Sequence, residues 1–416
     1  MSEKIEKVIN FGCRLNIYEG EVIRNSLLEA EREDVVVFNT CAVTMEAEKQ
    51  ARQAIRRMKR EHPNRKIFVT GCAVQVNPDS FAAMEEVDRV IGNNDKLFAK
   101  NYMVDVADKI IVDDIMRIKE SSAHLVSSFE GKARAFIEVQ NGCNHRCTFC
   151  IIPFGRGNNR SVPIGAIVEQ VRKLVANNYK EIVFTGVDIT GYGSDLPGSP
   201  TFGQMIRRVL NLVPDLVRLR LSSVDVAEID DELFDLITTE PRLMPHIHLS
   251  LQSGNDMILK RMKRRHLRAD IIDFVTRVRK VRDDVVFGAD IIAGFPTETE
   301  EMFNDSLSLV SEMGLVYLHV FPYSSREGTP AAKMPALPVV IRRARAKKIR
   351  EAGEVELNKF QQTQVGRTLK LMVEKDNIAR AENYITVKLD KAFEPGDILE
   401  AIVTEVRDNQ LYARAL

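Results

Sequence analysis

Short apolar runs alternate with amphipathic stretches along most of the chain. In residues 1–105 the apolar runs are EKVINF, DVVVFNT, KIFVTG and DRVIG, and stretches such as EAEKQARQAIRRMKREH separate them. This alternation predicts a parallel sheet covered by helices. We therefore expect an N-terminal doubly wound α/β domain over residues 1–105.

The alternation resumes after a polar stretch at 106–133, which we interpret as a linker or lid. Six further apolar runs follow, namely ARAFIEVQ, EIVFTGV, VRLRLSS, HIHLSLQ, VVFGADIIAG and VYLHVFP. Six strand–helix units predict a partial (βα)6 barrel over residues 130–345. A basic helix comes next. In residues 361–416 short strands with Pro-Gly and Asp-Asn turns predict a small β-barrel.

Length, charge and hydropathy narrow the class of protein. The chain has 416 residues, 59 basic and 59 acidic side chains and zero net charge. This balance excludes a uniformly basic nucleic-acid coat protein but allows local basic faces. The N-terminus does not have the pattern of a secretory signal, and no run of 18 apolar residues occurs. We expect no membrane span and a cytoplasmic location.

Three of the six cysteines lie close together, and their spacing indicates a metal centre. Cys143, Cys147 and Cys150 form a CxxxCxxC motif. Three thiolates can hold three irons of a cubane cluster and leave the fourth iron open for a reacting molecule. Zinc and free thiols are the alternatives. A structural zinc site needs a fourth ligand, which His145 inside the loop could supply.

The other three cysteines are dispersed, but each follows a predicted strand. Cys13, Cys41 and Cys72 come after VINFG, VVVFNT and IFVTG. The carboxyl ends of strands in such a sheet share one edge, so the three thiols can converge there. Three buried structural cysteines are the alternative. Convergence predicts a second cluster with an open iron.

The CxxxCxxC motif, with Phe149 before its last cysteine, resembles the signature of radical S-adenosylmethionine (SAM) enzymes. The resemblance implies a partial barrel, a 4Fe-4S cluster and bound SAM. Each predicted barrel strand also ends in a polar or glycine-rich turn, where barrel active sites lie. We expect Asp188 to act with the three cysteines in catalysis. The resemblance implies cofactor contacts by Phe149, Thr185, Gly186, Asp188, Ser223, Asp225, Gln252 and Gly294.

Almost the whole chain resembles the methylthiotransferases. The motifs GCRLNIYE, NTCAVT, TGC and CNHRCTFCIIPFGRGNNRSVP carry the likeness, and 361–416 resembles a TRAM domain, an RNA-binding barrel. The resemblance implies two 4Fe-4S clusters, SAM and an unidentified electron donor and sulfur source. FGCRLNIYE and GRGNNRSV favour the branch that modifies N6-threonylcarbamoyladenosine at position 37, in the anticodon loop of tRNA. Branches that modify isopentenyladenosine or a ribosomal-protein aspartate, and a non-catalytic iron–sulfur RNA sensor, are the alternatives.

An RNA substrate requires phosphate contacts, which a neutral chain must supply locally. Basic runs lie at KRMKRRHLR (260–268), at RRARAKKIR (342–350) and in AEKQARQAIRRMKR. The C-terminal segment has eight basic and nine acidic residues. We therefore expect the basic helices, including Arg264 and Arg265, to carry much of the phosphate binding.

Overall fold

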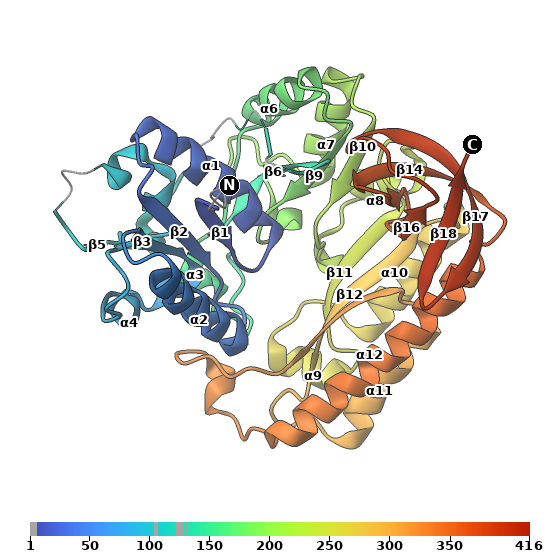
Figure 1. The fold of residues 1–416 in the computed structure, drawn as a ribbon. Coiled ribbons are helices and arrows are strands. Elements are labelled where there is room, and N and C mark those ends of the chain that lie inside the picture. The colour runs from blue at the N-terminus through green and yellow to red at the C-terminus, as the bar shows by residue number, and fades with distance from the viewer. Residues whose placement is uncertain (1–5, 104–106, 122–125, 127, 130) are drawn as a thin grey trace.

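The fold is described from a computed structural model covering residues 6–103, 107–121, 126, 128–129 and 131–416. Part of the predicted linker and the boundary residues 1, 105 and 130 lie outside these ranges. An α/β unit at the N-terminus and a β-barrel at the C-terminus flank a central strand–helix barrel (Figure 1). The predicted α/β class and the three-part architecture are confirmed.

The N-terminal unit is a five-stranded parallel sheet in which strand order follows chain order. Its strands are β1 (Val8–Asn10), β2 (Val35–Thr40), β3 (Lys66–Gly71), β4 (Arg89–Ile91) and β5 (Ile110–Ile111). Its helices are α1 (Arg14–Glu29), α2 (Met45–Glu61), α3 (Cys72–Val76) and α4 (Pro78–Ala82). Every residue of β2 is buried, as its continuous apolar run predicts.

The local sequence determines where helix α2 begins and ends. The Thr44 hydroxyl accepts a hydrogen bond from the Ala47 amide, which satisfies one free donor at the helix start. Glu46 and Glu48 lie in the first turn and Lys59 and Arg60 in the last, so both ends complement the helix dipole. Ala51 and Ile55 are its buried residues, which leaves a wide polar face exposed.

The central barrel contains the six predicted strands as two parallel three-stranded sheets. The first holds β6 (Ala135–Glu138), β9 (Glu181–Thr185) and β10 (Arg218–Leu221), and the second β11 (His246–Gln252), β12 (Val286–Ala293) and β13 (Tyr317–Pro322). Isolated parallel bridges, Leu219 to Leu243 and Val224 to Leu249, join the two sheets. A short pair, β7 (Gln140–Asn141) and β8 (Arg160–Ser161), brackets the CxxxCxxC loop.

A helix follows each barrel strand, which completes the strand–helix alternation. These helices are α6 (Ile164–Ala176), α7 (Phe202–Leu212), α8 (Asp231–Thr239), α9 (Asp256–Met262), α10 (Arg268–Val281), α11 (Glu300–Glu312) and α12 (Val339–Gln362), and the short α5 (Ile152–Arg156) follows Cys150. Strand residues that face the helices, together with the apolar faces of those helices, form one large core. Helix α12 then leads into the C-terminal barrel (Figure 1).

The C-terminal barrel is closed, with strand order β14-β15-β16-β18-β17. Its strands are β14 (Thr368–Lys375), β15 (Ile378–Ala381), β16 (Thr386–Leu389), β17 (Ile398–Arg407) and β18 (Gln410–Ala415). The sequence pattern predicted four of them and missed the four-residue β15. Within the described residues no helix is long and apolar enough to cross a membrane.

Candidate functional site

The CxxxCxxC loop lies at the carboxyl end of the barrel, between β7 and α5. The Cys143 thiol donates to the Asp188 carboxylate at 3.5 Å, and the Arg264 guanidinium lies 3.7 Å from the Cys147 sulfur. Burial raises the pKa of Cys150, and with the added effect of neighbouring Cys147 that pKa is about 12. Burial, the charge of Asp188 and nearby Cys150 likewise raise the pKa of Cys143. Burial therefore disfavours the thiolate forms of Cys143 and Cys150.

His145, the candidate for a fourth zinc ligand, lies between two carboxylates. Its Nε2 lies 3.0 Å from the Asp188 carboxylate and 3.2 Å from that of Glu228. Hydrogen bonds to these two carboxylates raise the pKa of His145 to about 10, although burial opposes the shift. The three thiols of the loop match the three-cysteine ligand set of a cubane cluster with one open iron.

Asp225 and Arg264 form a buried ion pair beside the cysteines. The Arg264 guanidinium donates to the Asp225 carboxylate at 2.9 Å, and its side chain is 8% exposed. Burial raises the pKa of Asp225, but His266 and Arg264 outweigh it and hold that pKa far below its usual value. The prediction that Arg264 faces RNA phosphates is wrong. Its basic neighbours in sequence suggested a surface face, whereas its partner lies on the distant β10 turn.

The turn after β9 is held against the cysteine loop by a side chain that sequence reasoning missed. Gln140 accepts backbone hydrogen bonds from Val187 at 3.0 Å and from Asp188 at 2.8 Å. Thr185 ends β9 and is buried, paired with β6. A Cβ at Gly186 would lie 2.6 Å from the Gln140 carbonyl oxygen, so glycine permits this close approach.

The remaining predicted cofactor contacts lie at the carboxyl ends of other strands. Ser223 follows β10 and donates to Asp290 at 3.4 Å. Gln252 ends β11 with φ of 70°, and Gly294 follows β12 with φ of 73°. Phe149 packs with an apolar cluster that includes Phe295 and Tyr323. These residues lie at the carboxyl edge of the barrel. Asp188, Asp225 and the three cysteines of the loop lie at the centre of that edge.

The dispersed cysteines lie at one edge of the N-terminal sheet. They follow β1, β2 and β3, which are neighbours in the sheet. Burial raises the pKa of Cys41, and with the added effects of Cys72 and Cys13 that pKa is about 12. Burial also raises the pKa of Cys13, with Cys72 adding to the shift. A Cβ at Gly12 would lie 2.6 Å from the Cys41 sulfur, so the backbone passes close beside the thiols.

Arg156, at the end of α5, connects this second triad with the central barrel. Its Nε donates to the Cys72 sulfur at 3.1 Å, and its guanidinium pairs with Glu19 at 2.7 Å. Glu19 also pairs with Lys96 at 2.7 Å, and both side chains are fully buried. Helix α5 directly follows Cys150, so five residues bridge the two triads. All six cysteines are free thiols, and three at each site suit one cluster apiece.

A polar group inside the second barrel sheet had no local sequence signal. The Asp290 carboxylate Oδ1 lies 3.1 Å from His248 Nε2 and 3.1 Å from His319 Nδ1. Burial raises the pKa of Asp290, but hydrogen bonds from both histidines outweigh it and lower that pKa strongly. The residues belong to three strands and meet only through strand register. His319 is 59% exposed, so the group opens toward solvent.

Comparisons with known proteins agree with this geometry. The radical SAM superfamily profile matches residues 137–310, and the uncharacterized protein family UPF0004 matches residues 6–92. A solved radical SAM methyltransferase, TsrM from Kitasatospora setae, superposes with a TM-score of 0.55 at 15% identity. The match covers 79% of this chain and 77% of that one, and it shows a shared fold. Fold and site together define a radical SAM enzyme.

Sequence relatives show to which family of radical SAM enzymes the chain belongs. A threonylcarbamoyladenosine tRNA methylthiotransferase MtaB of Rickettsia prowazekii is 58% identical, over 98% of this chain and 96% of its own length. The MtaB of Aquifex aeolicus is 36% identical over 94% and 98%. A tRNA-2-methylthio-N(6)-dimethylallyladenosine synthase of Erythrobacter litoralis is 31% identical over 100% and 98%. The chain belongs to the MtaB family of threonylcarbamoyladenosine tRNA methylthiotransferases.

Proposed function

We propose that the chain is a tRNA methylthiotransferase that adds a methylthio group to carbon 2 of N6-threonylcarbamoyladenosine at position 37. The observation that carries this proposal is a pair of three-thiol sites, joined by α5, in a chain 58% identical to a relative of that name. The higher identity with that relative, 58% against 31% for the dimethylallyladenosine synthase, supports the same substrate and favours this branch over the dimethylallyladenosine branch.

The chemistry explains why two sites are needed. A C–H bond on an aromatic carbon has no useful acidity, so a general base cannot activate it. A 4Fe-4S cluster with SAM at the Cys143 site supplies, when bound, a 5′-deoxyadenosyl radical that can break such a bond. The second triad suits a cluster that holds the sulfur to be methylated and transferred. The protein's own task is to hold both sites and one base in line.

We assign the binding of the cluster loop and of SAM to individual residues. Asp188 and Arg264 hold the cysteine loop, as their contacts with Cys143 and Cys147 support. We assign the Thr185–Asp188 turn to the methionyl amino group of SAM. Ser223, Asp225 and Gln252 would lie near its ribose or the substrate, and Gly294 near its adenine, with Phe149 beside them.

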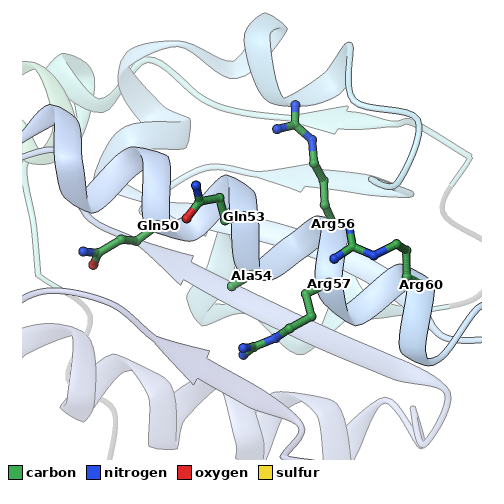
Figure 2. Close-up of a pocket in the computed structure, with 6 residues that line it drawn as sticks. All are labelled: Gln50, Gln53, Ala54, Arg56, Arg57 and Arg60. Atoms are coloured by element: carbon green, nitrogen blue, oxygen red, sulfur yellow. The ribbon is translucent and has the colours of Figure 1, made fainter.

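Phosphate binding is assigned to exposed basic helices. Helix α2 presents Arg56, Arg57 and Arg60 around a shallow hollow of about 450 Å³ (Figure 2). Helix α12 exposes Arg343 and Lys347 in the same manner. These side chains replace Arg264 in the proposed RNA contact, because they are exposed to solvent and can meet phosphates. A tRNA substrate would place the enzyme in the cytoplasm, with a reductant and a sulfur source still to be identified.

We keep the division into domains 1–105, 130–345 and 361–416 as a proposal. The three separate groups of strands support it. Limited proteolysis followed by mass spectrometry would test it, with cleavage expected between these ranges rather than within them.

Nucleoside mass spectrometry of tRNA from cells with and without the gene tests the function. Loss of 2-methylthio-N6-threonylcarbamoyladenosine in the deletion strain is expected. Loss of the methylthio group from isopentenyladenosine instead, or an altered ribosomal-protein mass with unchanged tRNA, would contradict it. Cleavage of SAM by the reduced, reconstituted protein separates an enzyme from a non-catalytic iron–sulfur sensor.

Iron analysis tests the two-cluster assignment independently of activity. Reconstituted wild-type protein should hold about eight irons per chain. Cys143→Ala and Cys41→Ala should each retain about four, and the double variant almost none. Full iron content in either single variant would refute the ligand assignment.

A further inference from the structure

Arg14 follows Cys13 directly and opens helix α1. Its Nη2 donates to the Tyr384 hydroxyl at 3.0 Å, across the whole length of the chain. Among the described residues no carboxylate lies within 4.0 Å of this guanidinium. Within the described residues Arg14 is therefore a half-buried cation without a carboxylate partner, and it directly follows a cysteine of the second triad in sequence.

The surroundings of Tyr384 carry an excess of positive charge. Four guanidinium groups lie within 6 Å of its ring, at 5.6 Å for Arg14, 5.7 Å for Arg134, 5.3 Å for Arg220 and 4.3 Å for Arg380. Three of these four arginines are paired with carboxylates. Arg134 and Arg380 pair with Glu374 at 2.6 Å, and Arg220 pairs with Glu181 at 2.7 Å.

Arg218 adds a fifth cation to this group and Glu382 a third carboxylate. Five cations thus face three anions. Burial raises the pKa of Tyr384, but Arg14, Arg134 and Arg380 outweigh it, so that the pKa lies below its usual value. An anion placed beside Arg14 would meet a favourable potential.

This cationic region continues toward the polar group of the second barrel sheet. The His246 ring stacks on Tyr384, with centroids 4.5 Å apart and planes 10° apart. His248 follows on the same strand face, and its ring lies 4.5 Å from that of His319. Hydrogen bonds then lead through Asp290 to Ser223 at the carboxyl edge of the barrel. Arg14 therefore lies between the second triad and the polar interior face of the barrel.

We propose that Arg14 binds the carboxylate of the substrate's threonylcarbamoyl side chain and is a specificity-determining residue of the enzyme. The inference rests on the proposed function and names the group that recognises its substrate. The threonine carboxylate is attached through N6. Only two ring atoms, C6 and N1, lie between N6 and carbon 2. When carbon 2 faces the second triad, the threonylcarbamoyl side chain extends toward the residues beside Cys13. Arg14, which follows Cys13, is a cation at that place.

The dimethylallyl group of the related branch is neutral and apolar, so a guanidinium in this place would select against it. A planar guanidinium can bind a carboxylate with two parallel hydrogen bonds, and Arg14 already has one donor fixed by Tyr384. Arg14 therefore discriminates by charge, since a dimethylallyladenosine substrate would leave this half-buried guanidinium unpaired.

The test uses full-length tRNA that carries the threonylcarbamoyl group either as the free acid or as its methyl ester. Reconstituted wild-type enzyme should prefer the acid by roughly 10- to 150-fold in kcat/KM, the range of one charged hydrogen bond. Arg14→Gln should lose that factor on the acid and change little on the ester. Equilibrium binding of both tRNAs should show the same pattern, and Arg14→Lys should keep most of the preference.

Arg277→Gln, on the exposed face of α10, is the matched control and should behave like wild type. The inference fails if wild type uses acid and ester equally, if Arg14→Gln slows both alike, or if that variant loses iron. It also fails if His319→Gln abolishes the preference while Arg14→Gln retains it. If Arg14→Gln does not fold, two other measurements test the inference. Wild type should still prefer the acid to the ester, and Tyr384→Phe should weaken that preference. Wild type without any methylthiolation of the acid would refute the proposed function instead.

Discussion

Glu19 and Glu138 are both buried, yet their carboxyls titrate in opposite directions. Burial raises both pKa values, but Arg156 and Lys96 outweigh it at Glu19 and lower that pKa to about 2. At Glu138 the nearby charge of Glu19 adds to burial, and the pKa rises to about 7. Hydrogen bonds from Ser121 and Asn141 offset only part of this shift. Partners, rather than burial, therefore decide which carboxylate stays ionised.

Glu138→Gln should remove a pH dependence of folding stability. The folded pKa of about 7 lies above the ordinary value of 4.5, so this group favours the folded state at low pH. That contribution is lost as pH rises from about 4.5 through 7, and amounts to about 3 kcal/mol. Urea unfolding at pH 5 and pH 8 should show the variant gaining this amount relative to wild type. Glu169→Gln, at an exposed position of α6, should not gain it.

The sequence was informative about residues wherever a local signal existed. Cys143, Cys147 and Cys150 follow from spacing, and the other triad follows from strand ends. Arg264 was misassigned because its neighbours in sequence are basic, while its partner Asp225 is 39 residues away. The Asp290 group was missed because it depends on the register of three strands, which no local pattern encodes.

At the scale of elements, the sheet β11–β12–β13 depends on one close contact. His248 pairs in register with Gly288, which pairs with Tyr317. A Cβ at Gly288 would lie 2.6 Å from His248 Nδ1 and 2.6 Å from the Tyr317 carbonyl oxygen. The glycine therefore provides the space in which the His248 ring reaches Asp290.

Gly288→Ala should destabilise the protein by about 1–3 kcal/mol, the usual cost of overpacking a core. Gly165→Ala is the matched control, since a Cβ there meets nothing within 4 Å in helix α6. It should be neutral or stabilising by up to about 1 kcal/mol. Urea midpoints of the two variants check this, and equal midpoints would contradict the packing argument.

Helix α2 offers a test of the RNA-facing surface. Arg57→Glu with Arg60→Glu should weaken tRNA binding and reduce the slope of log affinity against log salt by about one for each phosphate that the variant no longer neutralises. The pair Arg277→Glu and Lys280→Glu on α10 makes the same charge change elsewhere. If both pairs of substitutions lower the slope equally, α2 has no specific role.

Elements were predictable where the hydrophobic period was clear. All six barrel strands were found, because each contains a short apolar or alternating run bounded by turns. Strand β15 was missed because its four residues, IARA, include Arg380 and follow a turn at Asp376. Its pairing with β14 and β16 comes from barrel closure, which is a tertiary constraint.

At the scale of the whole molecule, one buried carboxylate holds the C-terminal barrel to the central one. Glu181 is fully buried and pairs with Arg220 at 2.7 Å and with Arg134 and Arg218 at 3.7 Å. Arg220 donates to the carbonyl oxygens of Ala381 and Glu382. This contact between the two barrels is therefore charged and buried.

Glu181→Gln should cost about 3–5 kcal/mol, because it leaves buried guanidinium groups without their counter-charge. Hydrogen exchange should rise first in β15, whose carbonyls lose their fixed partner. Glu405→Gln, at a 52% exposed position, should change stability by less than about 0.5 kcal/mol. A loss of stability without faster exchange in β15 would contradict the docking role. None of this contact was predictable, since it joins residues about 160 positions apart.

The hydrogen bond between Tyr384 and Arg14 also orders events during synthesis. A ribosome makes both cysteine triads within the first 150 residues but reaches the phenol only near the end of the chain. A nascent or truncated protein without Tyr384 therefore leaves the guanidinium beside Cys13 without this hydrogen-bond acceptor. The C-terminal barrel thus supplies the partner that fixes the direction of Arg14, a residue made long before it.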